Sequence, residues 1–166
     1  MHLERVSEGP VHCFAGLGNV LLSLYWGAPD ARVLEDRIPW VERTMKRYEK
    51  GGLFVVVCST ASGTLPGTEF REKSRQQALQ YRGHIGFSAS VLEGDQLLTG
   101  LARTFLRGLA LVAGQGVETA FFEDVPRAAA WVEPRSQPLG GPTADLMVSA
   151  IKLLRLQRER ERGGPR

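Results

Sequence analysis

The side chains best suited to chemistry lie in a segment rich in hydroxyls and glycines, STASGTLPGT, at residues 59–68. It follows an apolar, β-branched run and precedes a charged, helix-like segment. Phosphate-binding loops often lie between a strand and a helix, but a Walker loop requires a lysine followed by serine or threonine. Here Gly67 is followed by Thr68 and Glu69. The sequence therefore predicts no nucleotide hydrolysis, and the segment is either a regulated loop or a plain polar connection.

Other groups with catalytic potential are scattered. His2, His12 and His84 are far apart, and the sequence contains no CxxC, HxxxH or GxSxG pattern. Zinc sites and serine hydrolases rely on such spacings. Cys13 and Cys58 lie in apolar runs, which favours buried free thiols in a cytoplasmic protein. We therefore expect no cofactor, no metal and no catalytic residue, and a protein that is not an enzyme.

Positive charge is concentrated at the C-terminal end. Residues 152–166 carry a net charge of +4 and residues 1–151 about −1. Aromatic residues do not alternate with basic ones, so nucleic acid is not an expected partner. No apolar run reaches the roughly 18 residues that span a bilayer, and the first residues lack the apolar centre of a secretory signal. We expect a cytoplasmic protein.

Short apolar runs alternate with amphipathic segments along the chain. Runs at 11–15 and 19–26 flank GLGN and predict a β-hairpin, with Gly16 and Gly18 able to adopt positive φ. Apolar runs within 53–60, 84–93 and 117–124 predict three more strands. Helices are predicted at 28–50, 68–81, 96–114, 125–133 and 143–163.

Helix ends are marked by residues with known positional preferences. Pro39 must kink or split the first helix, which Gly51 and Gly52 then end. The segment PRSQPLGGP, residues 134–142, breaks the structure before the last helix. The predicted N-caps are Asp30, Thr68, Asp95, Asp124 and Thr143.

This order of elements predicts an α/β fold. We expect a mainly parallel, mixed sheet of about five strands that begins with the hairpin, is flanked by helices and is followed by an extra C-terminal helix. Residues 1–138 form one α/β domain, and residues 139–166 form an amphipathic helix with a basic tail. Leu146, Ile151 and Leu154 lie on the apolar side of that helix.

The hairpin and the β–α repeats after it resemble the STAS fold of anti-anti-sigma factors and their SpoIIAA-like relatives, over about residues 11–134. The stretch FFEDVPRAAAWV is similar to the last strand and helix of those proteins. The resemblance implies a bacterial, non-enzymatic regulatory or scaffolding protein, whose contacts with another protein are switched by phosphorylation after the central strand. The loop lacks the Asp-Ser element usual in that family. The corresponding candidate hydroxyls are Ser59, Thr60, Ser62, Thr64 and Thr68.

A protein partner is the expected ligand. Candidate partner-binding residues are Arg71 and Arg75 on the basic helix, and Leu146, Ile151 and Leu154 on the last helix. The apolar side of the last helix covers its own sheet, a second copy in a homodimer, or a partner.

Two alternative functions remain open. One is a protein of the same fold that binds a small apolar ligand or lipid beside the apolar helix at 96–114. The other is an adaptor attached to a membrane surface through the basic tail. Glu159 and Glu161 dilute the charge of that tail and disfavour membrane attachment.

Overall fold

The computed structural model describes residues 2–58, 66–94, 100, 103–108, 111 and 117–163. They contain a six-stranded sheet in which neighbours in sequence are neighbours in space. The first three strands pair antiparallel and the last four pair parallel. The predicted α/β class and mixed sheet with an antiparallel hairpin are confirmed, with one strand more than expected. The strands are β1 (Leu3–Gly9), β2 (His12–Leu17), β3 (Val20–Tyr25), β4 (Gly51–Val57), β5 (Ile85–Leu92) and β6 (Glu118–Phe122).

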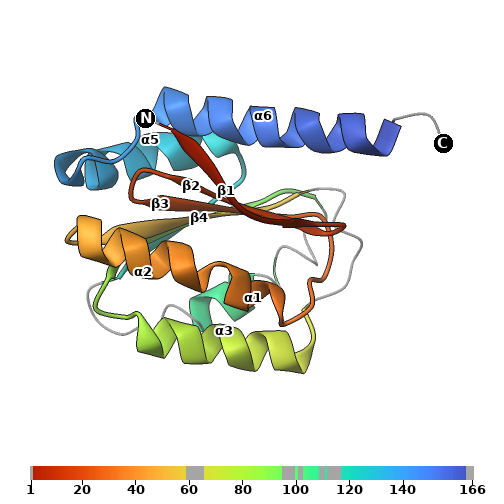
Figure 1. Ribbon diagram of the computed structural model, residues 1–166, viewed down its shortest axis with the longest axis horizontal. Helices are drawn as coiled ribbons and strands as arrows, with labels where there is room; N and C mark the ends of the chain where they lie inside the picture. Colours follow the sequence, from red (N-terminus) through yellow and green to blue (C-terminus); the bar gives the residue numbers. More distant parts are fainter. Residues whose placement is uncertain are drawn as a thin grey trace.

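Helices cover both faces of the sheet (Figure 1). One face carries α1 (Val33–Asp36), α2 (Ile38–Arg47) and α3 (Thr68–Gln80), and the other carries α5 (Val125–Ser136) and α6 (Ala144–Gly163). The parallel strands follow one another in a single direction, so right-handed crossovers place the helices that connect them on one face. The helices after the last strand then cover the opposite face.

Both faces of the central strands are buried. The larger core lies between the sheet and α5 and α6, and it includes Leu22, Phe54 and Met147. On the other face, Phe14 and Leu21 pack with Trp40 of α2. Because side chains alternate along a strand, the continuous apolar runs supply both cores at once.

The predicted hairpin is formed by β2 and β3, and its turn uses one of the two candidate glycines. Leu17 pairs with Val20 across the turn, and Gly18 has φ of 61°. Glycine at the first central position of a two-residue loop is typical of a type II′ turn. Gly16 lies instead in β2 under Trp40, whose Nε1 would come within 1.9 Å of a Cβ at that position.

Strand β1 is absent from the sequence prediction. Its side chains include Glu4, Arg5 and Glu8, and none of its residues is fully buried. It forms one edge of the sheet, and its register is interrupted between Arg5 and Ser7. Charges and irregular pairing are typical of protected edge strands, which lack the apolar alternation used to detect strands.

The first predicted helix is split, as Pro39 implied. The break falls at Arg37, between α1 and α2, and Pro39 lies in the first turn of α2. Asp30 accepts a hydrogen bond from the amide of Arg32 at 2.8 Å. Its prediction as an N-cap is wrong, because α1 begins at Val33 and Arg32 precedes it.

Gly51 and Gly52 do not end the helix as predicted. α2 ends at Arg47, and the two glycines open β4. Gly52 pairs with Phe87 of β5, and the aromatic ring occupies the space that a Cβ would fill. The glycines therefore serve strand packing.

The ends of α5 and α6 agree with the prediction except at the C-terminal end of α5. The side chain of Asp124 accepts from Arg127 N at 2.8 Å, and that of Thr143 from Leu146 N at 3.3 Å, so both predicted caps are confirmed. However, α5 continues through Pro134 to Ser136, and a 3₁₀ turn, η1 (Gln137–Leu139), follows.

Most of the predicted helix at 96–114, with its cap Asp95, lies outside the described residues, although residues 103–108 are helical. Across the described part of the chain, every helix is either too short or too polar to cross a bilayer.

Candidate functional site

Four of the five candidate hydroxyls, Ser59, Thr60, Ser62 and Thr64, lie outside the described residues. Thr68 is described, but its predicted role as an N-cap is wrong. It is the first residue of α3, and Gly67 holds the cap position without a side-chain hydrogen bond. Thr68 is exposed, and its Oγ1 accepts a hydrogen bond from Arg71 at 3.2 Å. The hydroxyl is thus accessible at the positive end of a helix.

Arg71 and Arg75 lie on the exposed side of α3. Arg75 donates two hydrogen bonds to Glu72, at 3.1 Å and 2.9 Å. The hydrogen bond from Arg75 lowers the pKa of Glu72, and the same contact raises the pKa of Arg75. The positive charge of Arg75 is therefore paired with a carboxylate of its own helix.

The last helix is attached to the body by polar contacts along its C-terminal half. Arg155 forms an ion pair with Glu93 at the end of β5, at 2.8 Å. Arg5 of β1 donates to the side chain of Gln157. Arg158 donates to the backbone oxygen of Gly9 at 3.3 Å and to that of Pro10. These contacts join α6 to β1, to the turn between β1 and β2, and to the end of β5.

Arg158 is the most buried cation of α6, with 8% of its surface exposed. Its guanidinium lies over the ring of Trp26, 4.2 Å from the centroid. Burial, followed by the neighbouring charge of Arg162, lowers the pKa of Arg158. Its Nε is buried without a hydrogen-bond partner among the described residues. Arg158 therefore combines packing with hydrogen bonding.

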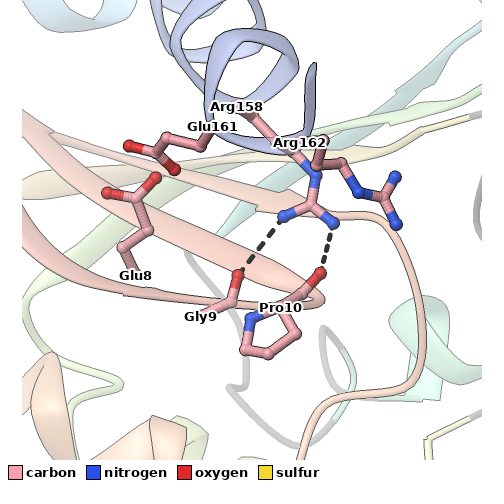
Figure 2. A pocket seen from close by; sticks show the side chains of 6 residues that line it. All are labelled: Glu8, Gly9, Pro10, Arg158, Glu161 and Arg162. Carbon is pink, nitrogen blue, oxygen red and sulfur yellow. Dashed lines mark hydrogen bonds between the residues drawn. The ribbon is translucent and has the colours of Figure 1, made fainter. Parts of the chain in front are cut away.

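A depression of about 400 Å³ opens beside Arg158 (Figure 2). The carboxylates of Glu8 and Glu161 lie together on one side of it, and Arg162 lies on the other. Gly9 and Pro10 form its floor. Four of its six lining residues are charged. The apolar ligand considered from the sequence was expected beside the helix at 96–114, most of which lies outside the described residues.

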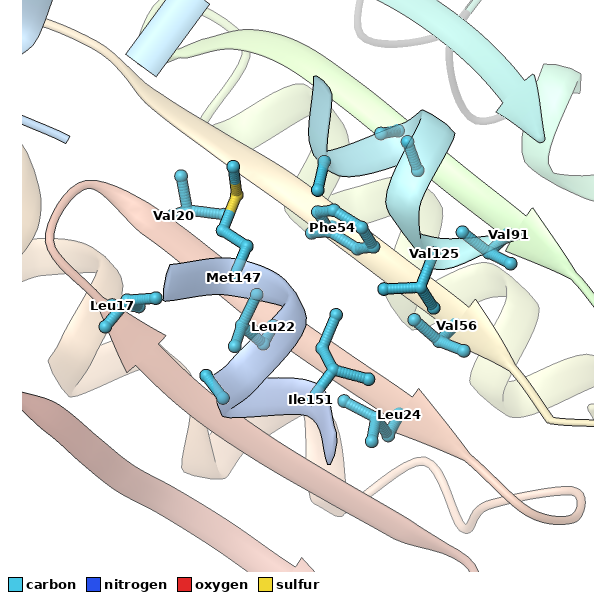
Figure 3. Close-up of a cluster of buried hydrophobic side chains, with 14 of the residues drawn as sticks. Leu17, Val20, Leu22, Leu24, Phe54, Val56, Val91, Val125, Met147 and Ile151 are labelled. Carbon is cyan, nitrogen blue, oxygen red and sulfur yellow. The ribbon is translucent and has the colours of Figure 1, made fainter. Parts of the chain in front are cut away.

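The two faces of α6 separate residues that the sequence placed on one apolar side. Ile151 and Leu154, with Met147, are buried against the sheet, with at most 2% of their surface exposed. Figure 3 shows Met147 and Ile151 pointing toward Leu22 and the neighbouring strands. These α6 residues fill the core of their own chain.

Leu146 lies on the opposite side of α6, together with Leu153 and Leu156. Their exposed fractions are 43%, 46% and 43%. We call these three residues the leucine row. Since the opposite face of the helix is already buried, the leucine row is apolar surface available for contact with another molecule.

Both thiols are buried and free, as the sequence indicated. Burial raises the pKa of Cys13 and that of Cys58 to about 11 each. A thiol attacks as its thiolate, so these cysteines are poor nucleophiles near neutral pH.

One cluster of serine, histidine and aspartate was not anticipated. Ser7 Oγ donates to Asp36 Oδ2 at 2.6 Å and lies 3.1 Å from His12 Nε2. Ser7 sits between the other two, whereas in a catalytic triad the histidine lies between serine and aspartate. Because Ser7 donates its proton to Asp36, Ser7 accepts from His12, and the imidazole is not placed to remove the serine proton.

His12 is 5% exposed, and its Nδ1 is buried without a partner among the described residues. Burial lowers the pKa of His12, with Asp36 opposing the shift. The cluster was missed because Ser7 and Asp36 meet His12 only through the unpredicted strand β1 and the helix break.

Arg158 was missed because the sequence pattern places it in the basic tail that follows the amphipathic part of the last helix. The signal was present, since Arg158 follows Ile151 by seven residues and Leu154 by four, on the same helical face.

The chain was compared with models of protein families, with curated proteins and with solved structures, and none of the three comparisons found a match.

Proposed function

We propose that this protein is a non-enzymatic interaction module that recognises another protein chain through the leucine row of α6. The observation that carries the proposal is the exposure of Leu146, Leu153 and Leu156 on a helix whose other side is buried. Each half-exposed leucine retains apolar surface whose burial is worth about 1–2 kcal/mol. A partner that covers all three gains a useful share of a binding free energy.

The groups closest to catalytic chemistry have other roles in this structure. The thiols of Cys13 and Cys58 have pKa values of about 11, and the hydroxyl of Ser7 donates a hydrogen bond to Asp36. These observations support recognition over catalysis as the role of the protein.

The proposal retains the STAS-like regulatory role in a bacterial cytoplasm. Its support is the order of elements, in which a hairpin leads into parallel strands connected by helices. The exposed Thr68 at the start of α3 is the described residue on which a switch would act.

Site-specific photo-crosslinking tests the proposal. A photoreactive amino acid at Leu156 samples the leucine row, and the same residue at Leu79 is the matched control, since Leu79 is 39% exposed on α3. After irradiation of native cells, mass spectrometry should identify a protein adduct at position 156 and a different pattern, or none, at 79. A folded protein that yields no protein adduct at 156 would contradict the proposed function.

A further inference from the structure

The leucine row belongs to a heptad pattern on the outer side of α6. Leu146, Ser149, Leu153, Leu156 and Arg160 follow one another at spacings of three and four, and all five are exposed. The a and d positions of a coiled coil follow the same spacing, and they form a narrow stripe that packs against a second helix. We call these five residues the seam. The seam is separate from the face that Met147, Ile151 and Leu154 use against the sheet.

Charged residues border the seam on one side. Asp145, Lys152 and Glu159 are spaced by seven, each directly before an a position, and all are exposed. None of them makes an ion pair within the part of the chain that the structure describes. Charges at this position select partner and orientation in coiled coils.

We infer that the seam is covered by a second copy of this chain, with the two α6 helices antiparallel and centred between Leu153 and Leu156. This inference rests on the proposed function and names its partner. Leu153 of each copy then packs against Leu156 of the other, and Ser149 faces Arg160. In an antiparallel pair, positions that precede a on the two helices lie side by side, so Lys152 of each copy lies beside Glu159 of the other.

The charges disfavour the other simple arrangements. An antiparallel pair shifted to place Leu146 against Leu156 brings Lys152 beside Lys152, and Asp145 beside Glu159. A parallel pair places Arg160 against Arg160. The arrangement centred between Leu153 and Leu156 is the one that joins leucines and opposite charges together.

The expected dimer is weak. α6 has 20 residues, so the helix pair is about 30 Å long, and a contact confined to it is smaller than a standard protein interface. We expect a dissociation constant of about micromolar or weaker. Association must therefore be measured over a wide range of concentration, by sedimentation velocity and light scattering on the full chain.

A charge exchange tests the arrangement. Lys152→Glu and Glu159→Lys should each weaken dimerisation about tenfold or more, because each places two like-charged pairs across the seam. The double variant restores opposite charges and should recover the affinity of the unchanged protein. Leu153→Glu should abolish the dimer. Circular dichroism and thermal unfolding of each variant check that these exposed substitutions leave the fold intact.

Two results would overturn the inference. One is a monomer at every concentration, and the other is a dimer whose affinity is unchanged by the single charge variants or unrestored by the double variant. The proposed function can hold even where this inference fails. A cross-link from position 156 to a different protein, with a monomer in sedimentation, rejects the second copy and retains the interaction module.

Discussion

The guanidinium of Arg158 lies between the ring of Trp26, 4.2 Å from its centroid, and the backbone oxygens of Gly9 and Pro10. One side chain thus fastens the C-terminal half of α6 to the turn between β1 and β2 and to the end of β3. The same attachment fixes the direction in which the leucine row points. Arg158 is therefore a positioning residue for the proposed interaction surface.

Arg158→Ala should destabilise the fold by about 2–4 kcal/mol, because it removes a buried stacking group and leaves two carbonyls without their donor. Arg158→Lys keeps the positive charge but lacks the planar guanidinium, so it should recover only part of the lost free energy of unfolding. Urea unfolding, followed by the fluorescence of Trp26 and the other tryptophans, measures both variants. Arg82→Ala, at an exposed position after α3, is the control, and an equal effect there would refute the role of Arg158.

The pairing of Gly52 with Phe87 gives a second prediction. A Cβ on Gly52 would lie 1.8 Å from the buried ring, so Gly52→Ala requires the ring or the strand to move. We expect a loss of about 1–3 kcal/mol in the free energy of unfolding. Gly83→Ala is the matched control, since a Cβ there has open space, and it should be neutral or stabilising by up to about 1 kcal/mol. Equal effects of the two substitutions would disprove the packing argument.

The buried His12 makes stability depend on pH. Burial lowers its pKa below the ordinary 6.5, so between these two values the unfolded chain binds more protons than the folded one. Stability from this residue should therefore fall as the pH drops through about 6.5, and stop falling below the pKa of the folded state. His12→Gln should remove that part of the pH dependence. The midpoint of denaturant unfolding, measured at several pH values between about 5 and 8, reports this pH dependence, because that range includes the ordinary pKa of histidine.

His84→Gln is the control for this measurement because it leaves His12 in place. It should retain the slope seen for the unchanged protein. If the slope disappears in His84→Gln and persists in His12→Gln, the assignment to His12 is wrong.

The two thiols give a test of the core itself. Cys13 is 2% exposed and Cys58 is 4% exposed, and each has a pKa of about 11. Both should react with a thiol reagent at neutral pH far more slowly in the folded protein than in denaturant, where both become available. Rapid modification of either cysteine in the native state, with the fold retained, would contradict its placement in the core.

Much of the fold followed from the sequence because its apolar runs are long and its turns are marked. The hairpin at Gly18, the parallel strands and the caps Asp124 and Thr143 all carry local signals. Strand β1 has none, since an edge strand is stabilised by pairing with β2 and can consist of charged residues. The prediction that Gly52 ends a helix was wrong because this glycine makes room for the ring of Phe87, which lies 35 residues away in the sequence.

The candidate site was less predictable for the same physical reason. Helical periodicity identified an apolar α6, but it could not say which leucines face the sheet, since the helix carries apolar residues around more than half of its circumference. Burial divides them into Ile151 and Leu154 inside and Leu146 outside. The partners of Arg158 lie about 150 residues earlier in the chain, beyond any local pattern.

The last prediction concerns Thr68. Because its side chain does not cap α3, replacing it by glutamate removes no capping bond, and the new charge lies at the positive end of the helix beside Arg71. Thr68→Glu should therefore fold normally and be more stable by about 0.3–1 kcal/mol, whereas Thr68→Lys should lose a similar amount. Thermal unfolding at low salt measures both, and destabilisation by glutamate would show that Thr68 does cap the helix.

A folded Thr68→Glu protein also reports on the predicted switch. Since α3 and α6 cover opposite faces of the sheet, Thr68 and the leucine row lie on different sides of the sheet (Figure 1). If the loop regulates that surface, it must act through the sheet, and the cross-link at position 156 should weaken in Thr68→Glu but not in Thr68→Ser. An unchanged cross-link in both variants would mean that a charge at Thr68 does not control the α6 surface.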